Sequence, residues 1–215
     1  MRKSEGTSAQ IRQYQLSRSG PLRLAARLRR LRISGMVKDL FSLVAATAIG
    51  QSLPVLAAPL LTRLYTPEDF GVFAVYSSLI VVLGPVATLR YENAIPLPKA
   101  DGIAIGILTL CFILVLCTAL VTGAVLWVLH EGWLSASFLE PLLPWWWLVP
   151  LSVIALGFYQ SLSQWAIRTK QFSALARTRV QQGVASVVVQ LLLGVLASGP
   201  IGLLVGQAIG QSAGI

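Results

Sequence analysis

The chain has 215 residues, of which 55% are apolar and only 12% are charged, and its mean hydropathy is +0.74. This composition excludes an ordinary soluble domain, in which charged residues make up about a quarter of the chain. The net charge of +9 would indicate nucleic acid in a soluble protein. Ten of the seventeen Lys and Arg lie in the first 38 residues, where membrane lipids are the acidic partner that we expect, and we predict no nucleic-acid partner.

Residues 1–35 form a basic extension. Its first twenty residues are polar and lack apolar periodicity, so we expect them to be disordered. The following segment places three leucines on one helical face, next to arginines at the same spacing, at Leu24, Leu28 and Leu31. Such a basic amphipathic helix is suited to an anionic membrane surface. Met36 opens a sequence typical of a membrane protein, so residues 1–35 are either a genuine extension or the product of a start site placed too early.

Five stretches after the extension contain no charged residue: 40–62, 70–89, 102–129, 141–167 and 180–215. A helix crosses the ~30 Å hydrocarbon core with about 20 apolar residues, so each of the first four stretches supplies one span. The fifth stretch is long enough for two spans and is interrupted at Gly199-Pro200. We therefore predict an all-α, polytopic transmembrane helix bundle in which residues 36–215 form six spans, at about 40–62, 70–89, 102–129, 142–165, 180–198 and 200–215.

Basic residues alternate between the connections of the predicted bundle. The N-terminal segment and the connections after the second and fourth spans hold ten, two and four Lys and Arg, sixteen in all. The remaining three connections together hold one, Arg63. Because basic loops stay in the cytoplasm, this pattern predicts a multi-pass membrane protein with a cytoplasmic N-terminus.

The connection after the first span contains the signals of a helix start. Thr66 is a typical N-cap, Pro67 suits the first helical position, and Glu68 and Asp69 place acidic groups in the first turn. Arg63 precedes this cap and has two interpretations. It either pairs with one of the two acidic residues or binds an anionic substrate at the outer mouth.

Arg90 and Glu92 lie at the cytoplasmic end of the second span. Ionisable groups at membrane depth cost roughly 2.5–3.5 kcal/mol, so those that occur there usually face a cavity or a partner. One interpretation is that Arg90 binds an anionic head group or phosphate, with Glu92 modulating it. The other is that both side chains extend to the water interface and orient the helix.

Neutral polar residues form a second group of candidates. Gln51 lies in the first span, and the end of the fourth span carries four polar residues within five positions, at Gln160, Ser161, Ser163 and Gln164. Four such residues are too many for one packing contact, so we expect this end of the fourth span to face a hydrated cleft. The last span carries a glycine at every fourth position, which predicts close helix packing by Gly202, Gly206, Gly210 and Gly214.

Enzyme chemistry is not expected from this sequence. His130 has no second histidine nearby, and Cys111 and Cys117 are not at a spacing typical of metal ligands, so we predict no catalytic residues, no metal site and no cofactor.

Three segments carry a resemblance to a known family. They are LTRLYTPEDFG at 61–71, LRYENAI at 89–95 and RTKQFSALARTRVQQ at 168–182. From Met36 to Ile215 the chain resembles the N-terminal half of bacterial O-antigen-type polysaccharide flippases, which belong to the multidrug/oligosaccharidyl-lipid/polysaccharide exporter superfamily. The basic extension lies outside the resemblance.

The resemblance implies an inner-membrane transporter of lipopolysaccharide, capsule or exopolysaccharide biosynthesis. Its substrate would be an undecaprenyl-pyrophosphate-linked oligosaccharide, moved by alternating access through a central cationic cavity between two lobes of six helices. Arg90 and Glu92 match the family motif at the end of the second helix, and Arg63 matches the motif of the first loop. With these three we take Gln51, Gln160 and Gln164 as substrate-binding candidates.

Two features leave alternatives open. The chain holds six predicted spans where the family has twelve or more, so we expect a truncated chain; otherwise a second lobe comes from a separate chain or from a second copy. A cation-coupled multidrug exporter of the same superfamily is one alternative function, although the first span lacks an acidic residue. A non-transporting membrane scaffold for polysaccharide assembly is the other.

Overall fold

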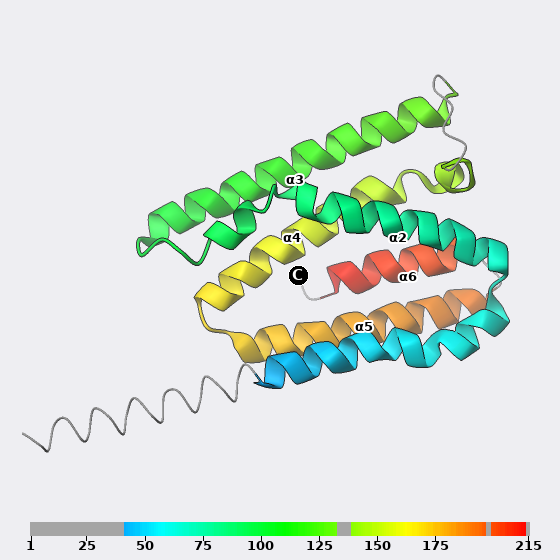
Figure 1. Ribbon diagram of the computed structural model, residues 1–215, viewed down its shortest axis with the longest axis horizontal. Coiled ribbons are helices and arrows are strands. Elements are labelled where there is room, and N and C mark those ends of the chain that lie inside the picture. The colour runs from blue at the N-terminus through cyan, green and yellow to red at the C-terminus, as the bar shows by residue number, and fades with distance from the viewer. Residues whose placement is uncertain (1–40, 133–138, 197–198, 214–215) are drawn as a thin grey trace, which may run out of the picture. The chain divides into compact units, whose positions relative to one another are not determined.

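The computed structural model describes residues 41–132, 139–196 and 199–213 (Figure 1). The chain divides into two units, Met1–Ser42 and Leu43–Ile215. The predictions for residues 1–35 lie outside the described residues, and the second unit holds the helix bundle.

The described residues form helices joined by turns, and no strand occurs among them, which confirms the all-α prediction. In chain order the elements are the Phe41–Leu64 helix, α2 (Pro67–Ala87), the short 3-10 helix η1 (Tyr91–Ala94), α3 (Asp101–His130), the 3-10 helix η2 (Glu140–Trp145), α4 (Leu148–Arg168), α5 (Phe172–Val195) and α6 (Ile201–Ser212).

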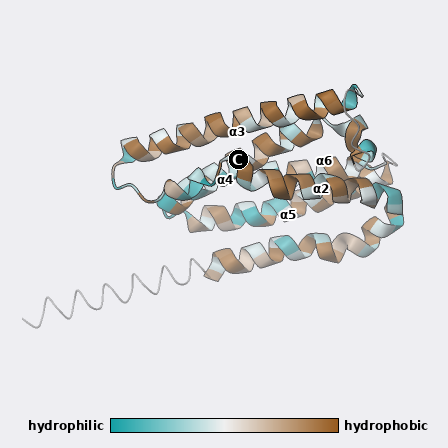
Figure 2. Cartoon of the chain, turned by 45° about the horizontal axis from the view of Figure 1, so that its top comes forward, coloured by the Kyte–Doolittle hydropathy of each residue, from teal (hydrophilic) through white to brown (hydrophobic). Residues whose placement is uncertain are grey.

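Three helices are long and apolar enough to cross a membrane: Phe41–Leu64, α2 and α3. Their outward surfaces are also apolar, since Leu120 of α3 is 73% exposed and Val81 of α2 is 73% exposed. Figure 2 shows α3 coloured as hydrophobic along most of its length. Soluble proteins rarely expose apolar surface on this scale, so the chain is a membrane protein with three helices of spanning length.

The six-span prediction is confirmed only in part. Among the described residues, α4, α5 and α6 are not helices that are both long and apolar enough to cross a membrane, and their boundaries differ from those predicted. Helix α4 begins at Leu148 rather than at residue 142, because two prolines shape the preceding η2 turn. Helix α5 begins at Phe172, eight residues before the predicted start at 180, and so includes Arg177 and Arg179. Charge set the predicted boundary, but long arginine side chains at a helix end reach water without ending the helix. Helix α6 has 12 residues, about 18 Å at 1.5 Å per residue.

The predicted helix start at Thr66 is confirmed. The Thr66 hydroxyl accepts from the Asp69 N–H at 3.3 Å, and the Asp69 carboxylate accepts from the Thr66 N–H at 3.0 Å, which makes a complete capping box. Among the described residues, no ion pair joins Arg63 to Glu68 or Asp69. Next to the cap, Tyr65 is buried and donates its hydroxyl to the Gln190 carbonyl at 2.6 Å. Burial, and then the negative charge of Asp69, raise the pKa of Tyr65, which keeps the phenol protonated as a donor.

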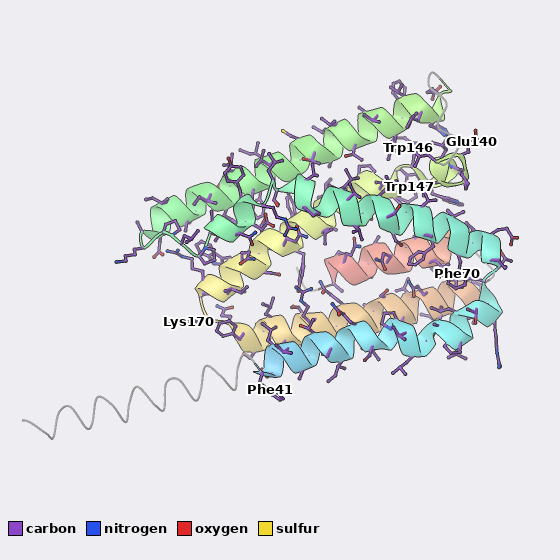
Figure 3. The ribbon with its side chains drawn as sticks, viewed as in Figure 1. Phe41, Phe70, Glu140, Trp146, Trp147 and Lys170 are labelled. Atoms are coloured by element: carbon purple, nitrogen blue, oxygen red, sulfur yellow. The ribbon has the colours of Figure 1, made fainter. Side chains whose placement is uncertain are left out.

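The connections fall at opposite ends of the helices (Figure 1). The α2–α3 and α4–α5 connections lie at one end, and the turn between the first helix and α2 lies at the other, with the end of α3 and the start of α4. Figure 3 shows Lys170 at the first of these ends and Trp146, Trp147 and Glu140 at the second.

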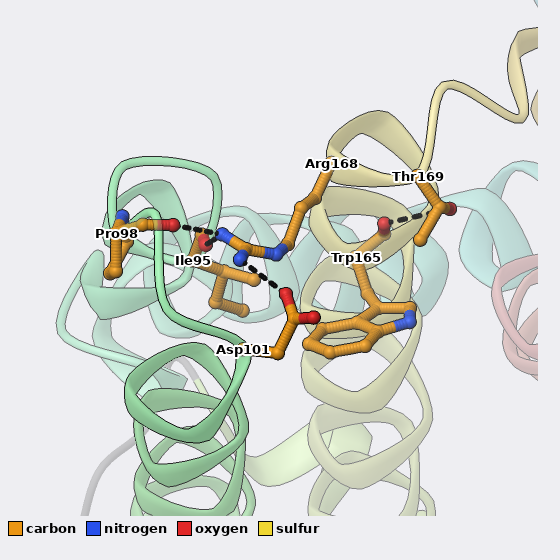
Figure 4. A network of polar contacts seen from close by, with 6 residues as sticks. All are labelled: Ile95, Pro98, Asp101, Trp165, Arg168 and Thr169. Atoms are coloured by element: carbon orange, nitrogen blue, oxygen red, sulfur yellow. Dashed lines mark hydrogen bonds and ion pairs between the residues drawn. The ribbon is translucent and has the colours of Figure 1, made fainter.

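Arg168 fastens the two connections at the first end. Its guanidinium donates to the carbonyl oxygens of Ile95 and Pro98 and forms an ion pair with Asp101 at 2.7 Å (Figure 4). The Arg168 side chain is 12% exposed, whereas that of Asp101 is 83% exposed. The backbone contacts are therefore the better protected part of this network.

An apolar core joins α2, α3, α4 and α6. Its fully buried members include Tyr76, Val115, Val149, Val153 and Leu204. The Tyr76 hydroxyl forms a buried hydrogen bond with Ser152.

The glycines of α6 pack closely against their neighbours, as predicted. A methyl group built on Gly206 would lie 2.3 Å from Cγ of Gln190, and one on Gly210 would lie 2.7 Å from Cβ of Ser186. A methyl group on Gly202 would lie 2.2 Å from the Tyr65 hydroxyl oxygen. Gly214 lies outside the described residues. The short separations show that α5 and α6 approach to a distance that only glycine permits.

Candidate functional site

Two adjoining polar cavities lie between the Phe41–Leu64 helix and helices α4, α5 and α6. The arginine cavity, of about 320 Å³, is lined by residues that include Arg90, Glu92, Gln160 and Gln164. The glutamine cavity, of about 440 Å³, is lined by residues that include Gln51, Gln182, Gln207 and Gln211. The two cavities share four lining residues: Thr47, Leu156, Tyr159 and Arg179. We therefore treat the two cavities together and call them the polar cleft.

A sharp backbone turn places Arg90 in the arginine cavity. Helix α2 ends at Ala87, and Leu89 and Arg90 then adopt φ angles of +50° and +64°. Two successive non-glycine residues in the left-handed region are uncommon, and each costs about 1–3 kcal/mol. Arg90 is exposed and lines the cavity, and the turn leads into η1, which carries Glu92.

Glu92 is buried at the base of this turn, with 4% of its surface exposed. Its carboxylate accepts a hydrogen bond from the hydroxyl of Thr88, which is itself fully buried. The sequence left open whether Glu92 reaches the water interface, and its burial favours the interpretation in which it faces a cavity. Arg90 and Glu92 both line this cavity, so the structure places the two predicted charges together.

The C-terminal half of α4 presents polar groups to the same cavity. Gln164 donates to the side-chain carbonyl of Asn93 at 3.1 Å, which ties α4 to η1. The buried Gln160 Oε1 and Ser163 Oγ atoms have no hydrogen-bond partner. A buried polar atom without a partner costs about 1–3 kcal/mol, so these atoms are available to a ligand or water. Ser161 instead turns into the protein and donates to the Gly157 carbonyl at 2.9 Å.

Arg179 of α5 lies where the two cavities meet. Its guanidinium carbon is 5.2 Å from the centroid of the Tyr159 ring, a cation–π distance. Tyr159 in turn shares a hydrogen bond with Thr178 at 3.3 Å. Stacking on a held aromatic ring fixes the direction of the arginine while its N–H groups remain able to donate.

The first helix and α5 touch beside the glutamine cavity. A methyl group on Gly183 would lie 2.3 Å from the Gly50 carbonyl oxygen, and one on Gly50 would lie 2.5 Å from the Arg179 carbonyl oxygen. Backbone therefore meets backbone at this point, and both glycines line the cavity. The contact sets the distance between the helices that carry Gln51 and Gln182.

The structure brings together five of the six predicted substrate-binding residues. Arg90, Glu92, Gln160 and Gln164 line the arginine cavity, and Gln51 lines the glutamine cavity. Arg63 lines neither cavity and is exposed near the end of the first helix, beside the α2 cap.

The lining residues that sequence reasoning missed include one arginine and three glutamines: Arg179, Gln182, Gln207 and Gln211. Arg179 was taken as part of a basic loop, although helix α5 already includes it. Gln207 and Gln211 are four residues apart and so share a helical face, a signal that the glycine pattern of the same helix obscured.

A third cavity, the apolar groove, contrasts with the polar cleft. It has a volume of about 580 Å³ and lies between α3 and α4, lined by Leu116, Ala119, Leu120, Gly123, Ala124, Trp127, Trp146, Pro150 and Ile154. No charged side chain lines it. The apolar groove thus involves α3, whereas the α-helix residues that line the polar cleft come from the first helix, α4, α5 and α6.

The cleft can bind an anion and hydroxyl groups. Arg90 and Arg179 supply cationic donors, and the glutamine amides supply both donors and acceptors. Within the part of the chain that the structure describes, no three His, Cys, Asp or Glu side chains gather in a group able to hold a metal ion.

Comparisons with protein-family models, with curated proteins and with solved structures find no match to this chain.

Proposed function

We propose that the chain is one lobe of a membrane transporter that moves a lipid-linked oligosaccharide between leaflets during lipopolysaccharide, capsule or exopolysaccharide assembly. One observation carries the proposal. Five of the six residues that the sequence indicates for substrate binding line one polar cleft, in a bundle whose outer surface is apolar. The family resemblance of the motifs around Arg63 and Arg90 supports the choice of substrate.

The chemistry of the cleft matches a pyrophosphate joined to sugars. Neither group crosses hydrocarbon unaided, because burying charge or unpaired hydroxyls costs several kcal/mol. In the cleft, Arg90 and Arg179 would bind the pyrophosphate, while the amides of the glutamines would replace water around the hydroxyls. The lipid tail would remain in the bilayer.

The setting of this lobe follows from the same proposal. The six helices are proposed spans in a bacterial inner membrane, with the N-terminus and the basic α2–α3 and α4–α5 connections in the cytoplasm. A second lobe would close the cleft from the opposite side. It would come from further chain, a separate chain or a second copy.

The test is an export assay with matched arginine variants in the bacterium that encodes the chain. Arg90→Gln and Arg179→Gln each remove a charged donor from the cleft, and we expect polysaccharide export to fall about tenfold or more. Arg177→Gln is the control, because Arg177 is exposed on the same helix and lines neither cavity. Surface polysaccharide, the lipid-linked precursor and drug efflux are measured together at equal protein level in the membrane.

Each outcome decides between functions. Loss of export with accumulation of the precursor supports the flippase. Normal export in Arg90→Gln and Arg179→Gln, with the protein at its normal level, contradicts it and favours the scaffold. Loss of drug efflux with normal polysaccharide contradicts it in favour of the multidrug exporter.

A further inference from the structure

Four glutamine side chains from three helices line the glutamine cavity: Gln51 from the first helix, Gln182 from α5, and Gln207 and Gln211 from α6. Ser186 adds a hydroxyl group. No carboxylate lines the cavity, and its one charged lining residue, Arg179, lies at the border shared with the arginine cavity. The interior of this cavity is therefore polar but neutral.

The amide of Gln211 points to an occupant that donates a hydrogen bond. Its Oε1 atom is buried and has no partner. The side-chain amide of Gln182 donates to the backbone carbonyl of Gln211 at 3.2 Å, so this part of α6 is already held against α5. A buried acceptor on a fixed helix requires a donor from a ligand or from ordered water.

We propose that the glutamine cavity binds a neutral sugar unit. Sugar hydroxyls both donate and accept hydrogen bonds, which is the same dual capacity that the glutamine amides have. A ring hydroxyl donates to Gln211 Oε1, and neighbouring amide N–H groups donate to ring oxygens. The cavity volume of about 440 Å³ lies within the range of sites for small organic ligands.

The position of Arg179 adds selectivity. A cationic amino sugar would be repelled by the guanidinium at the border of the cavity, whereas an N-acetylated or plain sugar would not. This inference rests on the proposed function in that the sugar is part of the lipid-linked substrate, whose pyrophosphate lies beside Arg90 and Arg179.

The test uses the full chain in lipid nanodiscs and saturation-transfer NMR with methyl N-acetylglucosaminide, and with glucosamine as the cationic probe. We expect the neutral sugar to bind and glucosamine to bind more weakly. Gln211→Leu and Gln51→Leu should each weaken sugar binding about three- to tenfold, since each removes one neutral hydrogen-bonding group. Gln181→Leu is the control, because Gln181 is exposed on α5 and does not line the cavity.

Thermal unfolding of each variant identifies a misfolded protein, and Gln51→Leu lies on a different helix from Gln211→Leu, so one variant reports if the other fails to fold. Three results would overturn the inference. The wild type does not bind the neutral sugar, Gln181→Leu weakens binding as much as the cavity variants do, or neither Gln211→Leu nor Gln51→Leu weakens binding.

A second probe separates this inference from the proposed function. If inorganic pyrophosphate binds through Arg90 and Arg179 but the neutral sugar does not bind, the sugar site is wrong and the transporter proposal stands. If the sugar binds through Gln211 while the arginine variants export normally, the transporter proposal is wrong and the sugar site stands.

Discussion

The two halves of α4 satisfy their polar groups differently. In the N-terminal half, Ser152 is fully buried and hydrogen-bonded to Tyr76, between the core residues Val149 and Val153. In the C-terminal half, Gln160 and Ser163 turn buried polar atoms into the polar cleft without partners. The N-terminal half of α4 thus belongs to the apolar core, and its C-terminal half belongs to the polar cleft. The two halves differ in whether their buried polar atoms have hydrogen-bond partners.

We expect the largest loss of stability from a substitution at the contact between the first helix and α5, beside the glutamine cavity. Gly183→Ala places a methyl group 2.3 Å from the backbone oxygen of Gly50. A backbone atom, unlike the end of a flexible side chain, cannot move aside by rotating. We expect a loss of about 3 kcal/mol or more in the free energy of unfolding, at the upper end of overpacking effects. Thermal unfolding in detergent measures it.

The control is Gly106→Ala in α3, where an added methyl group meets nothing within 4 Å. This variant should be as stable as the wild type or more stable by about 0.5–1 kcal/mol, since alanine favours the helix. Equal stability of the two variants would show that the first helix and α5 do not touch at Gly50 and Gly183.

The next effect concerns the network at the basic end of α4. Arg168→Gln removes the charged donor that the carbonyls of Ile95 and Pro98 share, and we expect the free energy of unfolding to fall by about 2 kcal/mol, typical of hydrogen bonds from a charged group. Asp101→Asn should cost less than about 1 kcal/mol, because Asp101 is 83% exposed and solvent screens its ion pair. Chemical denaturation compares the two, and a larger effect of Asp101→Asn would contradict this assignment.

The smallest effect compares two serines of α4 directly. Ser152→Ala breaks the bond to Tyr76 and should lower the free energy of unfolding by about 1 kcal/mol. Ser163→Ala removes a hydroxyl that has no partner and should leave stability unchanged or slightly higher. If both serines lowered stability equally, Ser163 would have a protein partner, and the distinction between core and cleft would fail.

Local signals predicted much of the fold. Uncharged runs located helices because charge and hydrocarbon exclude each other, and the Thr66 cap followed from a short motif whose contacts are all within four residues. Boundaries set by charge were less accurate at α5, since Arg177 and Arg179 extend a helix that they were expected to end. Helix α4 begins later than predicted because of the prolines before Leu148, whose effect on the backbone is not reflected in hydropathy.

The site was only partly predictable, because it depends on which helices meet. The four polar residues within Gln160–Gln164 predicted a polar helix end. In the structure three of them line the cleft, whereas the Ser161 hydroxyl donates to the Gly157 carbonyl. Gln182 and Gln211 are 29 residues apart and come together only through the close packing of α5 and α6. No spacing rule within one helix relates them.

The central claim is that water reaches the polar cleft and not the apolar groove. Gln207→Cys and Leu120→Cys, each in a background with Cys111→Ala and Cys117→Ala, are exposed to a charged thiol reagent in broken membranes, with Lys99→Cys as the loop reference. We expect Gln207→Cys to react within about tenfold of the reference and Leu120→Cys to react at least about tenfold more slowly than Gln207→Cys, because the reaction needs a hydrated thiolate. Equal rates at the cleft and groove positions, or faster labelling at Leu120→Cys, would contradict the claim.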